Sequence, residues 1–175
     1  VRHRKPPSQT WRSFLDNHVS ELASVDFFTV PTATFRVLYV FIVSRHERRE
    51  IVHFNATYHP TAEWTAQQLV EAFPFDTAPR FVMRDRDSIY GKRFRTRVKS
   101  LGIEEVISAP HSPWQNPYVE RIIGSIRREC LNHVIIFNER HLRQVLKAYV
   151  TYYHEARTHL SLDKQSPVPR SIESP

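Results

Sequence analysis

Three acidic residues stand where a carboxylate could do chemistry. Asp26 lies inside the apolar run 22–30. Asp85 ends a second apolar run, and Glu120 follows a proline-containing loop that leads into an expected helix. An aspartate inside an apolar strand costs free energy unless it is paired or binds a metal. Two strand carboxylates and one helix carboxylate supply the oxygen ligands that a pair of hard divalent cations needs.

The spacing of these acids and two longer motifs resemble a known family. Asp85 and Glu120 are 120 − 85 = 35 residues apart, and with Asp26 they resemble the DDE triad of the transposase and retroviral integrase superfamily. Residues 112–121, Ser-Pro-Trp-Gln-Asn-Pro-Tyr-Val-Glu-Arg, resemble the segment that carries the glutamate in bacterial insertion-sequence transposases. Residues 153–162, Tyr-His-Glu-Ala-Arg-Thr-His-Leu-Ser-Leu, resemble the motif that ends the same catalytic core.

The resemblance implies an α/β, RNase H-like fold in which the first strand lies beside the fourth. It implies that Asp26, Asp85 and Glu120 are both the catalytic residues and the metal ligands. The implied cofactor is Mg²⁺ or Mn²⁺, as two ions, which suit oxygen ligands better than zinc does. The implied activity is cleavage of DNA and joining of strands by a homo-oligomer on element ends and target duplex. The expected location is the bacterial cytoplasm, at the nucleoid when acting, with no membrane partner.

Each acid also has a plainer interpretation. Asp26 could sit on an edge strand and point to solvent, and Asp85 could begin a turn. Asp87, two residues later, would be the ligand if the register were shifted. Glu120 could only favour the positive end of its helix. Two other functions therefore stay open: a metal nuclease of the same fold that does not join strands, and a non-catalytic basic DNA-binding module with a decayed site.

The charge distribution favours a polyanionic partner. The chain has 175 residues and a net charge of +7, and basic patches of this kind attract nucleic acid. Residues 84–99 hold seven Lys/Arg against two Asp, and residues 121–157 hold seven against three Glu. Gly124 removes side-chain bulk from the helix face that carries Glu120. The aromatic residues before Glu120 could stack on an unpaired base. The expected DNA-binding residues are Arg86, Lys92, Trp114, Gln115, Asn116, Tyr118, Arg121, Arg127 and Arg128.

Apolar runs and breakers predict a five-stranded mixed sheet flanked by helices. Strands are expected at 22–30, 35–43, 50–57, 80–84 and 103–108. Helices are expected at 11–18, 61–73, 91–101, from 117 onward, and at 139–153.

One domain is predicted. Residues 1–19 are expected to be a basic arm or linker remnant, 20–163 the integrase-type catalytic core, and 164–175 a proline-containing tail that is extended or disordered. The single cysteine, Cys130, excludes an internal disulfide framework and fits a reducing compartment. The chain begins at Val1, so we expect a fragment without the domain that recognises the element's ends. Such a fragment should bind DNA with little sequence discrimination.

Overall fold

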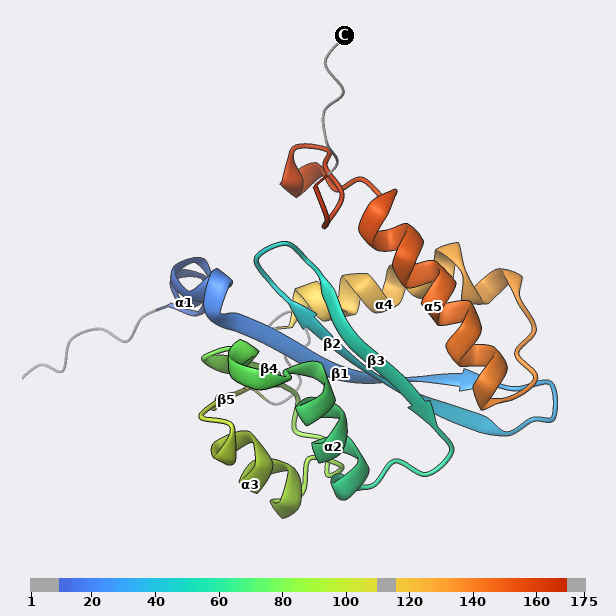
Figure 1. Ribbon diagram of the computed structural model, residues 1–175, viewed down its shortest axis with the longest axis horizontal. Coiled ribbons are helices and arrows are strands. Elements are labelled where there is room, and N and C mark those ends of the chain that lie inside the picture. The colour runs from blue at the N-terminus through green and yellow to red at the C-terminus, as the bar shows by residue number, and fades with distance from the viewer. Residues whose placement is uncertain (1–9, 110–115, 170–175) are drawn as a thin grey trace, which may run out of the picture.

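The chain forms one mixed sheet, as predicted. The computed structural model describes residues 10–109 and 116–169. The strand order is β3-β2-β1-β4-β5 (Figure 1), which confirms the expected α/β fold with the first strand beside the fourth. The strands are β1 (Leu22–Pro31), β2 (Val37–Arg45), β3 (Ile51–Thr57), β4 (Phe81–Arg84) and β5 (Glu104–Ile107).

The register shows why this topology follows from the sequence. β1, β2 and β3 form an antiparallel meander, while β4 and β5 add to β1 as parallel strands. Parallel strands need a crossover connection, and the segments between β3 and β5 supply helices for it. The connecting and flanking helices are α1 (Trp11–His18), α2 (Ala62–Ala72), α3 (Lys92–Ser100), α4 (Pro117–Glu129) and α5 (Glu139–Glu155), with short 3₁₀ turns at Val19–Glu21, Phe75–Thr77, Leu131–His133 and Leu160–Leu162.

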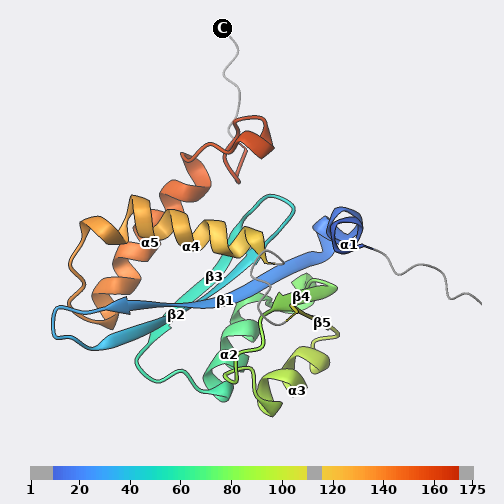
Figure 2. The ribbon, with the colours of Figure 1, turned by 180° about the vertical axis from the view of Figure 1, so that it is seen from behind.

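Helices cover both faces of the sheet (Figures 1 and 2). On one face, Phe28 of β1 packs with Ile122 of α4 and Leu146 of α5. On the other, Val25 of β1 packs with Leu69 of α2 and α3 residues. Successive strand residues point to opposite faces. Even-numbered residues of β1 therefore face α4 and α5, and odd-numbered residues face α2 and α3; below, residues on the same face are said to have the same parity. None of the helices in the described part of the chain is both long and apolar enough to cross a membrane.

The first helix is part of the packed structure. Trp11 and Phe14 of α1 pack against Leu22, Phe81 and Met83 at the junction of β1 and β4. Residues 11–18, which were expected within a basic arm, therefore cover an end of the sheet instead of extending from it.

Helix ends follow local sequence. Thr61 Oγ1 accepts a hydrogen bond from the Trp64 amide at 3.1 Å and so caps α2, as expected. Pro117 occupies the first turn of α4, where its missing N–H costs nothing. Gly102, which follows α3, has φ +72°, a conformation that glycine adopts without a steric penalty.

The second strand begins two residues later than predicted. Phe35 was expected to start it, but its φ is +57° and its side chain is 95% exposed. The Phe35 amide donates to the Thr32 carbonyl at 2.9 Å, and the Thr32 amide donates to the Arg36 carbonyl at 2.8 Å. These turn hydrogen bonds hold Phe35 outside the ladder, a tertiary outcome that an apolar run does not reveal.

The tail expectation is wrong for the residues described after Lys164. Gln165 forms a bridge with His159, and Ser166 is 1% exposed. Arg48, in the β2–β3 turn, donates from Nε to the Pro167 carbonyl at 2.6 Å. Hydrogen bonds therefore hold this segment against the β2–β3 turn and the end of α5, and its prolines do not imply disorder there.

Candidate active site

Strand pairing brings the two aspartates to one place. The β1–β4 register ends with Ser24 opposite Met83. Asp26 and Asp85 each lie two residues further along, so both keep the parity of that last pair. Phe28 has the same parity as Asp26 and packs with α4 residues. Both carboxylates therefore belong to the face of the sheet that α4 covers.

Helix α4 supplies the third carboxylate. Val119, Ile122, Ile123 and Ile126 are all buried against the sheet, at the i, i+3, i+4, i+7 spacing of one helix face. This apolar stripe fixes the helix and leaves Glu120 exposed in its first turn.

The carboxylates of Asp85 and Glu120 lie near enough to Asp26 to affect its pKa. The pKa of Asp26 is raised from 3.8 to about 7, chiefly by burial. The negative charges of Asp85, Glu120 and Asp87 contribute to this rise, whereas a hydrogen bond from the Phe27 amide to Asp26 Oδ1, 2.7 Å long, opposes it. Partial burial also raises the pKa of Glu120.

The donor set fits a hard divalent cation in its chemistry. All three side chains offer carboxylate oxygens, which Mg²⁺ and Mn²⁺ prefer, and Asp26 is a buried acid without a positive partner strong enough to hold its pKa down. As positioned, no three His, Cys, Asp or Glu side chains within residues 10–109 and 116–169 form a metal-holding group. Asp26, Asp85 and Glu120 stay the predicted ligands, and ion binding would have to draw their carboxylates closer together.

Asp87 takes part in the hydrogen bonds of the loop after β4. Its Oδ1 accepts a hydrogen bond from the Ile89 amide at 3.0 Å, and its own amide donates to Asp85 Oδ1 at 3.1 Å. Such contacts are typical of an aspartate that shapes a turn. Asp85 makes the same kind of contact through the Asp87 amide, so these hydrogen bonds do not separate the two aspartates, and Asp85 stays the predicted ligand because it directly follows β4.

The expected DNA-binding residues before Glu120 are only partly visible. Trp114 and Gln115 lie outside the described residues. Asn116 is 6% exposed, and its Oδ1 has no hydrogen-bond partner among the described atoms. The Tyr118 ring packs on His46 with centroids 4.4 Å apart, and the Arg49 guanidinium lies 5.5 Å from the Tyr118 centroid.

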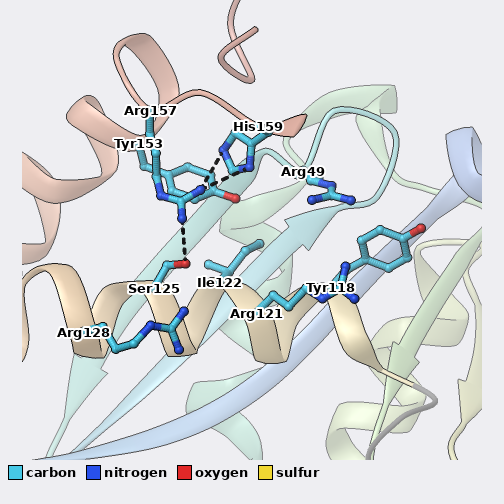
Figure 3. A pocket seen from close by; sticks show the side chains of 9 residues that line it. All are labelled: Arg49, Tyr118, Arg121, Ile122, Ser125, Arg128, Tyr153, Arg157 and His159. Atoms are coloured by element: carbon cyan, nitrogen blue, oxygen red, sulfur yellow. Dashed lines mark hydrogen bonds between the residues drawn. The ribbon is translucent and has the colours of Figure 1, made fainter. Parts of the chain in front are cut away.

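The basic residues of α4 divide between two sides of the helix. Arg121 and Arg128 line a pocket of about 190 Å³ (Figure 3), whereas Arg127 lies over the Phe28 ring at 5.9 Å and lines a separate groove. A Cβ added at Gly124 would lie 3.0 Å from Arg128 Nη1. The space that Gly124 leaves is therefore occupied by the Arg128 guanidinium.

Two expected DNA-binding residues lie elsewhere. Lys92 lines a groove between α2 and α3, in the opposite helical layer from Glu120. Arg86 donates from Nε to the Ser108 carbonyl at 3.0 Å and so joins the loops that follow β4 and β5.

The terminal motif splits into different roles. His154 Nε2 accepts a hydrogen bond from the Ile51 amide at 3.0 Å, so it secures the start of β3. Arg157 bonds Glu129 of α4 through Nε and Nη2, and His159 is buried beside it. Arg157 and His159 both line the pocket of about 190 Å³.

Sequence reasoning missed a buried histidine under the site. The Ser24 hydroxyl and His46 Nε2 form a hydrogen bond of 2.5 Å, and burial lowers the pKa of His46 to about 4. It also missed Arg49, which reaches the pocket from the β2–β3 turn. Only the folded meander brings these residues near α4, so no local signal could have identified them.

We expect His46 to make the protein sensitive to acid. Its folded pKa lies below the unfolded value of 6.5, so its contribution to stability is complete above pH 6.5 and is lost as pH falls through about 4. The loss amounts to about 3 kcal/mol. Urea unfolding of wild type and His46→Gln at pH 7 and pH 4 measures it. A stability difference between the two proteins that does not change with pH would contradict this role.

The family "Integrase core domain" matches residues 101–167. The HTLV-2 integrase catalytic core domain in complex with magnesium superposes with a TM-score of 0.66 at 11% identity, covering 85% of this chain and 93% of that one. The chain is similar to integrase cores in sequence and in fold. The resemblance predicted from the sequence is confirmed.

The chain is also similar to an insertion-element protein in sequence and to a transposase in fold. An uncharacterized 39.2 kDa protein of insertion element IS476 from Xanthomonas euvesicatoria is 25% identical over 165 residues, which cover 94% of this chain and 48% of that protein. The Mos1 transposase catalytic domain superposes with a TM-score of 0.66 at 12% identity, over 80% of this chain and 75% of that one. The chain spans about half the length of the first curated relatives that it matches.

Proposed function

We propose that this chain is the catalytic core of a transposase or integrase that cuts DNA and joins strands by metal-dependent phosphoryl transfer. The observation that carries the proposal is the proximity of Asp26 in β1, Asp85 directly after the adjacent parallel strand β4, and Glu120 in the first turn of α4. Similarity to integrase and transposase cores supports the same chemistry.

In this proposal the protein's own side chains hold the metal ions and the DNA backbone. Asp26 provides a rigid ligand because it lies within β1, and Asp85 and Glu120 approach it from a loop and a helix end. Two bound Mg²⁺ ions would supply an activated water or 3′-hydroxyl and stabilise the leaving oxygen of an in-line displacement. Arginines on α4 would hold the phosphate backbone across the site.

DNA is the proposed partner, as element ends and target duplex. We also propose a homo-oligomer on DNA, since the chain superposes on the intasome of simian T-cell lymphotropic virus with a TM-score of 0.68 at 12% identity, over 89% of this chain and 58% of that one.

The test is a labelled duplex incubated with the protein and Mg²⁺, with and without EDTA. Nicked products that need Mg²⁺ would support the enzyme, and products longer than the substrate would support strand joining. Nicks without longer products would favour the nuclease. Binding without any product would favour the non-catalytic module.

We expect DNA binding to depend steeply on salt. Arg127→Ala should lower the salt slope by about one, as for one lost phosphate contact, and Lys92→Ala should do the same if duplex DNA also covers α3. Anisotropy titrations of a random duplex between low and moderate salt measure the slopes. Lys147→Ala, on the exposed face of α5, is the control. An unchanged slope for Arg127→Ala would make this residue part of a solvated surface only.

A further inference from the structure

A basic pocket lies on one side of α4, and none of the three predicted metal ligands lines it. It is bounded by α4, the end of α5 with the loop after it, and the β2–β3 turn (Figure 3). Its volume is about 190 Å³. The side chains that line it are Arg49, Tyr118, Arg121, Ile122, Ser125, Arg128, Tyr153, Arg157 and His159.

The pocket carries more positive charge than its surroundings neutralise. Its lining includes four arginines and no acid. Glu129 lies behind it and bonds Arg157. Within residues 10–109 and 116–169, Arg49, Arg121 and Arg128 form no ion pair. Converging guanidinium groups without carboxylate partners are the arrangement that binds phosphate, because each planar group offers several N–H donors.

Part of the pocket is rigid before any ligand arrives. Arg157 Nη2 donates to Glu129 Oε1 at 2.8 Å and to Ser125 Oγ at 3.2 Å, while Nη1 lies 3.2 Å from His159 Nδ1. Burial, and then the charges of Arg157 and Arg49, lower the pKa of His159 to about 4. The neutral imidazole can therefore donate one N–H without adding a fifth charge.

The pocket and Glu120 lie at the same end of α4 but on different sides of the helix. Tyr118 and Arg121 line the pocket, and they lie two residues before and one residue after Glu120. Because successive helix residues point about 100° apart, DNA held by the pocket would lie along a side of α4 other than the one that carries Glu120.

We propose that this pocket binds a phosphate group of DNA beyond the carboxylates, and so fixes the duplex on α4. The choice of DNA as the source of the phosphate rests on the proposed function. The requirement for a tetrahedral oxyanion rests on the arginines alone.

The test uses the whole chain and the double variant Arg49→Gln/Arg128→Gln, which removes two unpaired guanidinium groups and keeps the Arg157–Glu129 contact. The matched control is Arg140→Gln, an exposed arginine at the other end of α5, about 20 Å along the helix from Tyr153. Anisotropy with a labelled duplex gives affinity and salt slope. Calorimetry with pyrophosphate gives anion binding without DNA. Circular dichroism checks that each variant is folded.

The double variant should lose at least 10-fold in pyrophosphate affinity and lower the DNA salt slope by about two, one for each lost phosphate contact. The control should change neither. Loss of pyrophosphate binding with an unchanged DNA slope would overturn the DNA assignment and leave a site for free anions. If neither pyrophosphate affinity nor the DNA salt slope changes, the proposal that this pocket binds phosphate is wrong. Cleavage is assayed separately, so a wild-type protein that binds DNA through this pocket but never cuts would refute the proposed function and not the pocket.

Discussion

Asp26→Asn, Asp85→Asn and Glu120→Gln should each abolish Mg²⁺-dependent cleavage while leaving DNA binding and fold intact. Each change removes one carboxylate charge and almost no volume. Loss of one preorganised electrostatic partner of a transition state costs about 10²–10³-fold, and a missing ligand to a shared metal pair should cost at least as much. Product formation on a labelled duplex under single-turnover conditions measures the effect.

Asp87→Asn is the matched control for these variants. An asparagine Oδ1 can still accept the hydrogen bond from the Ile89 amide, so the loop after β4 keeps its shape. We therefore expect Asp87→Asn to retain cleavage. Loss of cleavage in Asp87→Asn with activity retained in Asp85→Asn would show that the ligand register is shifted by two residues.

Asp26→Asn should also stabilise the metal-free protein above neutral pH. The folded pKa of Asp26 is about 7 and its unfolded value is 3.8. Between these values the folded protein holds a proton that the unfolded chain releases, so the free energy of unfolding falls as pH rises. The full loss in the free energy of unfolding is present above pH 7, where Asp26 is ionised in both states. This loss amounts to about 2–4 kcal/mol, and solvent screening of the carboxylate brings it toward the lower value.

Thermal unfolding in EDTA at pH 8 measures this gain, which should raise the Tm of Asp26→Asn by roughly 4–16 °C. Adding Mg²⁺ should stabilise the wild type and have little effect on the variant, because the ion supplies the missing positive charge only where the carboxylate remains. Asp163→Asn is the control, since its exposed left-handed backbone conformation also suits asparagine. Equal Tm values for wild type and Asp26→Asn in EDTA would show that the ionised Asp26 does not destabilise the folded protein.

The features of the fold that could be predicted from the sequence are those indicated by local patterns, such as apolar periodicity and residues that start helices. The apolar run around Asp26 marked β1, Thr61 marked the start of α2, and Pro117 marked the start of α4; the structure confirms all three. The isoleucine stripe of α4 identified its buried face, and therefore the exposed position of Glu120. These signals are strong because a helix or strand period applies along consecutive residues.

The part that could not be predicted depends on chain segments far apart in sequence. Nothing near Arg49 indicates that the β2–β3 turn reaches α4, and nothing near His46 indicates that it lies beneath Tyr118. The prolines after Lys164 suggested a loose tail, yet carbonyls of that segment accept hydrogen bonds from Arg48. Such contacts are specified by tertiary packing, so composition and periodicity carry no trace of them.

The parallel pairing of β1 with β4 also has a kinetic consequence. It joins Leu22 to Phe81, and pairings between distant segments form slowly because loop-closure entropy must be overcome first. The β1–β3 meander can assemble early from neighbouring segments, but it holds Asp26 alone. During refolding, the protein should therefore pass through a state in which much of the sheet exists while the three carboxylates are still apart. Cleavage activity should return later than strand structure does.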